Sequence, residues 1–202
     1  MTGKEMNPLA AKRRLRKLVR ERLQAGPAAA RTAWSLAICR HLSALPEWRR
    51  AADILAFLPL PDEPDIESLY GHCHAALHLP ALADGTPRVR PFRHGQGFIA
   101  GYRGIREPAT RELSRLDDIG LALVPGRAFT ADGGRLGRGG GHYDRLLAAL
   151  PADCLFVGVG FELQVLGGLP AADHDIPMHL VVTESGVRRC GGARAGSGAG
   201  GS

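Results

Sequence analysis

The sequence predicts a single α/β domain in which helices cover both faces of a layered, mostly parallel sheet. Three observations support this fold class. The chain has 202 residues and is 45% hydrophobic, which suits one domain with a substantial core. Short, wholly apolar segments alternate along it with segments of helical periodicity. Strands that lack a polar face are typical of a sheet that is buried on both sides.

Two helices are expected at the start of this domain. Asn7 and Pro8 form a helix start, because an asparagine side chain can cap the first turn and proline is tolerated at the first helical position. Apolar side chains then recur at helical spacing until Gly26, where this helix ends. A second helical pattern covers residues 27–45. Further helices are expected over 66–77 and 143–150.

Short apolar segments between and after these helices are expected to form the sheet. Prolines and glycines bound several of them, which favours strands that end in turns. The predicted strands cover residues 54–58, 78–82, 88–92, 121–124, 155–161 and 178–182. We expect one domain over 8–187, a flexible segment at 1–7, and a disordered Gly/Ala/Ser-rich tail at 188–202 with little apolar surface to bury.

The net charge of +6 is concentrated near the ends of the chain. Residues 1–22 carry +6 and residues 186–202 carry +3, which leaves −3 for the body between them. A nucleic-acid partner is therefore not expected, because such binding needs a broad basic face. No apolar run is long enough for a membrane span, so no membrane partner is expected either. Four cysteines without a CxxC pair suit a reducing compartment, and we expect a cytoplasmic protein.

A glycine-rich segment at 133–141 is the most informative part of the chain. Its six glycines precede a predicted helix, so their N–H groups and the helix N-terminus can approach an anion closely. Arg135 and Arg138 add guanidinium groups suited to phosphate oxygens, and Asp144 could hold a Mg²⁺ ion beside them. The spacing fits neither a Walker A loop nor a GxGxxG dinucleotide site. A phosphate cradle is therefore predicted, with a flexible surface loop as the ordinary alternative.

Two longer segments carry a family resemblance. Residues 124–129 read Val-Pro-Gly-Arg-Ala-Phe, and 135–145 read Arg-Leu-Gly-Arg-Gly-Gly-Gly-His-Tyr-Asp-Arg. Together they resemble the signature of the 5-formyltetrahydrofolate cyclo-ligase (5,10-methenyltetrahydrofolate synthetase) family. Weaker similarities follow in the family's order at 12–16, 57–63, 161–164 and 169–177. The resemblance covers about residues 8–185, and His142 departs from it where a tyrosine is common.

The resemblance implies an ATP- and Mg²⁺-dependent enzyme of one-carbon metabolism. Such an enzyme converts 5-formyltetrahydrofolate to 5,10-methenyltetrahydrofolate with release of ADP and phosphate. The γ-phosphate activates the formyl oxygen, and N10 of the folate then closes the ring. The implied partners are 5-formyltetrahydrofolate and ATP, in a monomer or a homodimer. The implied fold is a layered sheet like those of sugar-phosphate isomerases and CoA transferases.

The resemblance also assigns roles to individual residues. It implies nucleotide contacts for Lys12, Arg13, Arg14, Leu15 and Arg16, and for Arg135, Leu136, Gly137, Arg138, Gly139, Gly140, Gly141, His142 and Tyr143. Arg138, Tyr143 and Asp144 are implied to be catalytic. Metal positions match Asp144 and Asp175, and folate contacts match Leu58 and Glu63. A carboxylate at Glu63 could accept hydrogen bonds from the N–H groups of a pterin.

Each assignment has an ordinary structural alternative. These are a solvated helix face for Lys12 and Arg16, a turn acid for Glu63, a turn cap for Asp175 and a core side chain for Leu58. Two other functions also remain open. A phosphosugar isomerase on a related fold would need an acid/base pair beside the phosphate site, and a nucleic-acid-binding protein would use the basic N-terminal helix.

Overall fold

The computed structural model describes residues 7–83, 85–101, 104–170 and 175–191. Its α-helices are α1 (Pro8–Ala25), α2 (Ala28–Ala44), α3 (Pro46–Arg50) and α4 (His142–Ala148), and its 3₁₀ turns include η1 (Glu67–His72), η3 (Leu116–Asp118) and η4 (Glu162–Gln164). Within the described ranges no helix has both the length and the apolar run that a membrane crossing needs.

A seven-stranded sheet forms the centre of the molecule, in the order β12-β11-β9-β6-β1-β2-β3. Its strands are β1 (Asp53–Leu55), β2 (Ala76–Ala83), β3 (Thr86–Phe92), β6 (Leu121–Pro125), β9 (Leu155–Val159), β11 (Leu180–Thr183) and β12 (Gly186–Arg189). The five inner strands run parallel to one another, while β3 and β12 pair antiparallel at the two edges. The predicted mostly parallel α/β sheet is therefore confirmed.

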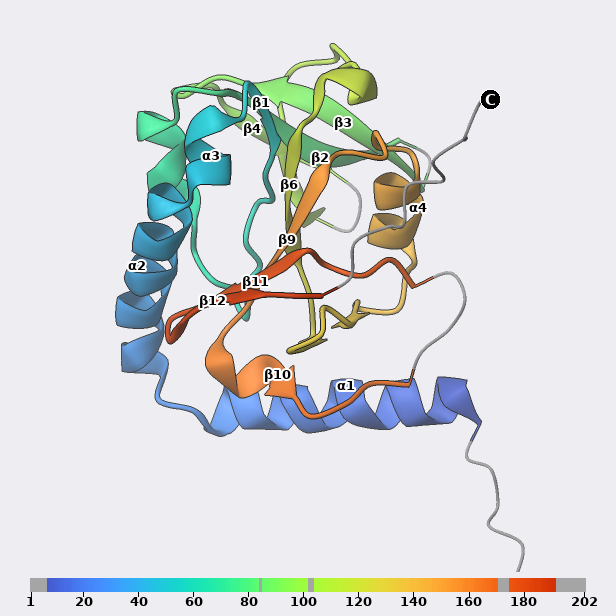
Figure 1. The fold of residues 1–202 in the computed structure, drawn as a ribbon. Helices are drawn as coiled ribbons and strands as arrows, with labels where there is room; N and C mark the ends of the chain where they lie inside the picture. The colour runs from blue at the N-terminus through green and yellow to red at the C-terminus, as the bar shows by residue number, and fades with distance from the viewer. Residues whose placement is uncertain (1–6, 84, 102–103, 171–174, 192–202) are drawn as a thin grey trace, which may run out of the picture.

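Helices cover both faces of this sheet, as the sequence predicts. Ile54 of β1 belongs to a core that also contains Val19 of α1 and Ile38 of α2. The next residue, Leu55, belongs to a second core with Leu147 of α4. Successive side chains of a strand point to opposite faces. Accordingly, Figure 1 shows α2 and α3 on one side of the sheet and α4 on the other.

The parallel strands direct the segments that follow them to one edge of the sheet. β1 continues into residues 56–63, β6 into Gly126, and β9 into η4. Helix α1 contacts η4 and lies along this carboxyl edge (Figure 1). Because ligands of open α/β sheets bind outside the carboxyl ends of the strands, the fold favours a site between α1 and these loops.

The predicted helix over 66–77 is wrong. Only the 3₁₀ turn η1 forms there, and Leu77 lies in β2, where it pairs with Ile54 of β1. Tyr70 and Leu77 are buried in the same core, but they belong to two different elements. Their helix-like spacing therefore reflects shared burial and not one continuous helix.

Two other boundaries differ from the expectation. The disordered tail was expected from residue 188, but Arg188 and Arg189 are part of β12 and pair with β11. The rest of that tail, from 192 on, lies outside the described residues, as do residues 1–6. The helix expected over 27–45 ends at Ala44, and Pro46 begins the short helix α3.

Smaller sheets flank the large one and were not predicted. β7 (Ala128–Thr130), β8 (Arg135–Leu136) and β10 (Val165–Leu166) form a three-stranded sheet, and β4 (Phe98–Ala100) pairs with β5 (Arg106–Pro108). β7 and β8 pair antiparallel, and the turn between them, residues 131–134, contains the first two glycines of the glycine-rich segment. The helix predicted over 143–150 follows that segment as α4.

Candidate active site

A pocket of about 170 Å³ opens at the carboxyl edge of the sheet. Its apolar lining includes Phe57, Leu58, Pro80, Leu82, Ile105, Tyr143 and Leu146. Its charged lining residues are Glu63, Arg106, Glu107, Arg135, Arg138 and Asp144. Apolar walls with a few converging charged groups are typical of a small-molecule site.

A second hollow, here called the basic groove, lies beside this pocket and measures about 560 Å³. Its cations are Arg13, Arg14, Arg16, Lys17 and Arg20 of α1, together with Arg127 and Arg138 from the body of the domain. Arg138 lines both the pocket and the groove. Such a concentration of positive charge is suited to a polyanion such as a chain of phosphate groups.

Glu63 and Arg138 meet where the pocket and the basic groove join. Oε1 of Glu63 accepts from Nε of Arg138 at 2.9 Å and from Nη2 at 2.7 Å. The other carboxylate oxygen accepts from the backbone N–H of Leu60 at 3.0 Å, and the side chain is only 6% exposed. Glu63 is therefore both a turn acid and a pocket residue, so the two readings of its role are compatible.

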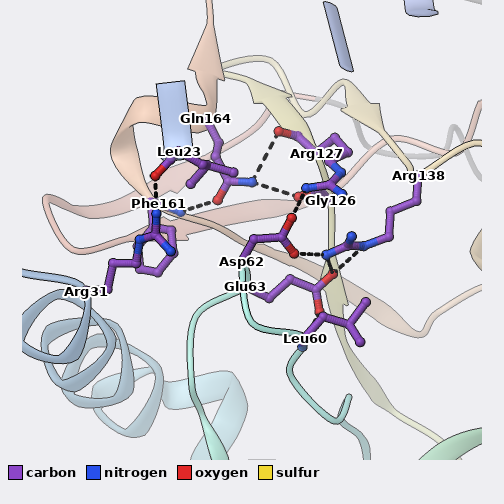
Figure 2. A network of polar contacts seen from close by, with 10 residues as sticks. All are labelled: Leu23, Arg31, Leu60, Asp62, Glu63, Gly126, Arg127, Arg138, Phe161 and Gln164. Atoms are coloured by element: carbon purple, nitrogen blue, oxygen red, sulfur yellow. Dashed lines mark hydrogen bonds and ion pairs between the residues drawn. The ribbon is translucent and has the colours of Figure 1, made fainter. Parts of the chain in front are cut away.

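Asp62 joins two arginines beside this pair (Figure 2). Its two carboxylate oxygens accept from Nη1 of Arg127 and from Nη2 of Arg138. Burial on its own would raise the pKa of Asp62, but the hydrogen bonds from the two guanidinium groups outweigh it and hold that pKa below its usual range. Burial would likewise lower the pKa of Arg138, and the attraction of Glu63 and Asp62 raises it instead.

Arg135 is held inside the glycine-rich segment. Its side chain is 3% exposed, and Nη2 donates to Oδ1 of Asp144. The guanidinium also lies over the ring of Tyr143, 5.8 Å from its centre. The Nε–H of Arg135 is buried and has no hydrogen-bond partner among the described residues. Burial raises the pKa of the Tyr143 hydroxyl, which therefore stays protonated at neutral pH.

Helix α1 is fastened to the glycine-rich segment and to the C-terminal part of the domain. Nζ of Lys12 lies 2.6 Å from Oδ2 of Asp175, and Nε of Arg16 donates to the carbonyl of Gly137 at 2.8 Å. Gly139 has a φ of 106°, a left-handed conformation that favours glycine, and a side chain there would contact Arg16. The solvated-face alternative is therefore wrong for Lys12 and Arg16, which are partly buried and bonded.

Among the predicted nucleotide contacts, Leu15 and Leu136 differ from the charged residues because their side chains belong to the core. Arg13 and Arg14 are exposed and line the basic groove together with Arg138 of the 135–143 segment. Leu15 packs against the core and Leu136 is buried in it, and neither lines the pocket or the basic groove. Leu58 is 8% exposed and is both a core residue and a pocket residue.

Asp144 and Asp175 are chemically suited to a Mg²⁺ ion that binds together with phosphate. Among the described residues no three His, Cys, Asp or Glu side chains are grouped to hold a metal. Mg²⁺ is usually bound by one or two carboxylates plus substrate phosphates, and does not need such a cage. Asp144 lines the pocket and is 28% exposed, whereas Asp175 lines a different hollow and is 26% exposed.

Sequence reasoning did not assign Asp62 or Arg127 to the site. Asp62 lies in the 57–63 similarity and Arg127 in the 124–129 segment, but the resemblance gives neither a role. The two residues are 65 positions apart, so no local pattern links them. The backbone of Arg127 is fixed by Gln164, a residue that is 1% exposed, whose Nε2 donates to the carbonyls of Gly126 at 2.8 Å and Arg127 at 3.2 Å (Figure 2).

Comparison with known proteins identifies the family to which the chain is similar. The model of the 5-formyltetrahydrofolate cyclo-ligase family matches residues 8–184. The mitochondrial 5-formyltetrahydrofolate cyclo-ligase of Arabidopsis thaliana is 28% identical, over 87% of this chain and 75% of that protein. The 5-formyltetrahydrofolate cyclo-ligase of Mycolicibacterium smegmatis is 30% identical, over 66% of this chain and 75% of that protein.

Solved structures lead to the same family. The 5,10-methenyltetrahydrofolate synthetase of Aquifex aeolicus aligns with a TM-score of 0.81 at 32% identity, covering 91% of this chain and 95% of that one. The corresponding synthetase from Mycoplasma pneumoniae shares the fold, with a TM-score of 0.66 at 18% identity over 86% of this chain. The match of the family model to nearly all of the described chain, together with the conserved layout of its fold, shows that the chain belongs to the 5-formyltetrahydrofolate cyclo-ligase family.

Proposed function

We propose that this chain catalyses the ATP-dependent conversion of 5-formyltetrahydrofolate to 5,10-methenyltetrahydrofolate, with release of ADP and phosphate. The observation that carries the proposal is the position of Arg138. It borders an apolar pocket with a buried carboxylate on one side and a groove of cations on the other. A ring system with N–H donors suits the first environment and a phosphate chain suits the second, so the two substrates would meet at this residue.

The pocket supplies what a reduced pterin needs. Phe57, Leu58 and Leu82 offer apolar surface for a flat ring, and Glu63 offers carboxylate oxygens. A pterin presents several N–H donors at its pyrimidine edge, and a carboxylate can accept two of them in parallel. Glu63 is held by Leu60 and Arg138, so its orientation is fixed before a ligand binds.

The glycine-rich segment and α1 supply the nucleotide side. Arg16 reaches this segment from the helix, Lys12 of the same helix pairs with Asp175, and Arg135 and Arg138 belong to the segment. Gly141 begins α4 in a left-handed conformation, with a φ of 63°, which a residue with a side chain adopts only with strain. The N–H groups near this turn and the four cations would bind the phosphate oxygens of ATP.

A divalent metal fits beside Asp144, with Asp175 as a second candidate ligand. A bound Mg²⁺ would neutralise charge on the phosphate oxygens and help to orient them. Asp144 forms an ion pair with Arg135, and Asp175 forms one with Lys12.

The proposed chemistry needs positioning and charge neutralisation more than a protein nucleophile. The formyl oxygen forms a bond to the γ-phosphorus while the bond from that phosphorus to the bridging oxygen breaks, which releases ADP. N10 of the folate then attacks the formyl carbon and loses its proton, and the carbon–oxygen bond breaks to release inorganic phosphate, which takes up a proton in its place. Arg135 and Arg138 stabilise the negative charge on the transferring group, and the apolar walls of the pocket exclude water. The sheet that carries this site would be of the type found in sugar-phosphate isomerases and CoA transferases.

One assay tests the proposal. Purified protein is mixed with 5-formyltetrahydrofolate, ATP and Mg²⁺, and the ultraviolet absorbance of the methenyl product is followed. We expect product only when protein, nucleotide and metal are all present. Equal rates with EDTA, or without nucleotide, would refute the ATP- and metal-dependent reaction.

A further inference from the structure

The ion-pair network in Figure 2 includes two residues, Asp62 and Arg127, to which the family resemblance assigns no role. Asp62 lies between two guanidinium groups, with Arg127 on one carboxylate oxygen and Arg138 on the other. The side chain of Arg127 is 15% exposed and that of Asp62 is 27% exposed, so the bridge is largely shielded from solvent. The backbone of Arg127 is fixed as well, because its N–H donates to the carbonyl of Leu136 at 2.7 Å and its carbonyl accepts from Gln164.

Each arginine in this bridge is held along one side of its guanidinium. Arg127 bonds Asp62 through Nη1, and Arg138 bonds Asp62 and Glu63 through Nε and Nη2. A guanidinium carries five N–H donors in a rigid plane, so both arginines retain donors for a further acceptor. Both also line the basic groove, which five cations of α1 complete. The retained donors therefore belong to a hollow whose charge suits phosphate groups.

We propose that Arg127 binds a phosphate group of the nucleotide beside Arg138, and that Asp62 is a positioning residue that aligns both guanidinium groups before the ligand arrives. This inference rests on the proposed function, because it concerns the same nucleotide. It adds two residues that the family signature does not assign. A fork held in place before binding loses less conformational freedom when it binds phosphate than a free arginine does.

The direction in which Asp62→Asn changes nucleotide affinity separates this proposal from a simple charge effect. Asp62 is an anion beside a site for a polyanion, so Coulomb repulsion alone predicts that Asp62→Asn would tighten nucleotide binding. Alignment predicts the opposite, because two long side chains would then have to be ordered during binding. We expect the Asp62→Asn protein to bind MgATP about tenfold more weakly.

The test is calorimetric titration of MgATP, without folate, into the unmodified protein and into Asp62→Asn, Arg127→Gln and the double variant. We expect Arg127→Gln to weaken binding by roughly tenfold to 150-fold, the range for one lost charge-assisted hydrogen bond. The double variant should lose less than the product of the two single losses, because both residues act through the same arrangement. Arg127→Lys should also bind more weakly than the unmodified protein, since it keeps the charge but loses the fork.

Arg115 and Asp118 provide the matched control, because they form the same kind of pair on the exposed turn η3, with side chains 78% and 50% exposed. Arg115→Gln and Asp118→Asn should change affinity by less than about twofold. Thermal melts identify any variant that fails to fold, and Arg127→Lys then stands in for Arg127→Gln. Unchanged or tighter binding by Asp62→Asn, or an Arg127→Gln affinity equal to that of Arg115→Gln, would overturn the proposal.

The unmodified protein separates the two proposals. If it does not bind MgATP, the proposed function fails, and the roles proposed for Asp62 and Arg127 fail with it. If it binds MgATP while the Asp62 and Arg127 variants bind equally well, only the role of these two residues is refuted.

Discussion

Replacing Asp144 with asparagine should affect the stability of the domain as well as its turnover. From its place at a loop-to-helix junction alone, this substitution would be expected to keep the fold and to lose only metal binding. In the structure, however, Asp144 neutralises Arg135, whose side chain is 3% exposed. Asp144→Asn would therefore leave a buried guanidinium without its counter-ion.

The size of the loss follows from the exposure of the two partners. Removing one partner of a fully buried ion pair costs about 3–5 kcal/mol. Asp144 is 28% exposed and asparagine keeps one acceptor oxygen, so we expect about 1.5–3 kcal/mol, the value for a hydrogen bond to a charged group. In a domain of this size that corresponds to a melting temperature lower by roughly 3–12 °C.

Thermal melts of three variants measure this. Asp144→Asn should melt lower than the unmodified protein, and adding Arg135→Met should restore part of the loss by removing the unpaired charge. Glu67→Gln is the matched control, because Glu67 pairs with an arginine, Arg106, that is 48% exposed. This substitution should lower the free energy of unfolding by less than about 1 kcal/mol. An Asp144→Asn melt equal to that of the unmodified protein would refute the reasoning. A Mg²⁺ titration of activity would separately report the metal role.

Four further outcomes are expected. Lys12→Met should raise KM for ATP by roughly tenfold to 150-fold, with little change for folate; a larger folate effect in steady-state kinetics would assign Lys12 to the other substrate. Glu63→Gln should weaken folate binding by more than about 1 kcal/mol and weaken nucleotide binding as well, because Glu63 anchors Arg138; normal folate binding by calorimetry would place the pterin elsewhere. The pKa of Asp62 is lower in the folded protein than in the unfolded chain, so Asp62→Asn should destabilise the fold at pH 7, and denaturant titrations should show this difference shrinking as pH falls through the folded pKa; a difference that grew toward acid pH would contradict it. Burial raises the pKa of Cys154 to about 12, so its thiol should resist a disulfide reagent at pH 8 until denaturant is added, and rapid labelling of Cys154 in the native protein would contradict this.

Elements with a simple burial pattern could be predicted from the sequence. The inner strands β1, β6 and β9 are buried on both faces, so each is a continuous apolar run that contrasts with its neighbours. Helix α1 has one buried stripe and a proline at its start, and its expected limits hold. The region around η1 had no such contrast. Tyr70 and Leu77 are apolar because each contacts the core, and their spacing alone could not separate a turn and a strand from one helix.

The local part of the site could be predicted from the sequence, and the long-range contacts could not. The glycine-rich segment is local, so its composition indicated a phosphate site and drew attention to Arg135 and Arg138. The bonds that orient these arginines are not local. Arg138 meets Glu63 and Asp62 from 75 and 76 positions away, and Asp62 meets Arg127 from 65. Such pairs depend on the order of the strands in the sheet, which no short pattern encodes.

The bond between Lys12 and Asp175 also bears on the order in which the protein is made. Its partners are 163 positions apart, and α1 is synthesised before any strand on which it packs. Until β9 and the segment around residue 175 have left the ribosome, Val19 and Leu23 of α1 have an incomplete core to bury them. Contacts of such high sequence separation form late, because the intervening chain must close first. The α1 side of the basic groove is therefore among the last parts of the domain to be assembled. A nascent chain released before residue 175 would contain the glycine-rich segment and the partner of Arg16, but it would lack β11, β12 and the partner of Lys12.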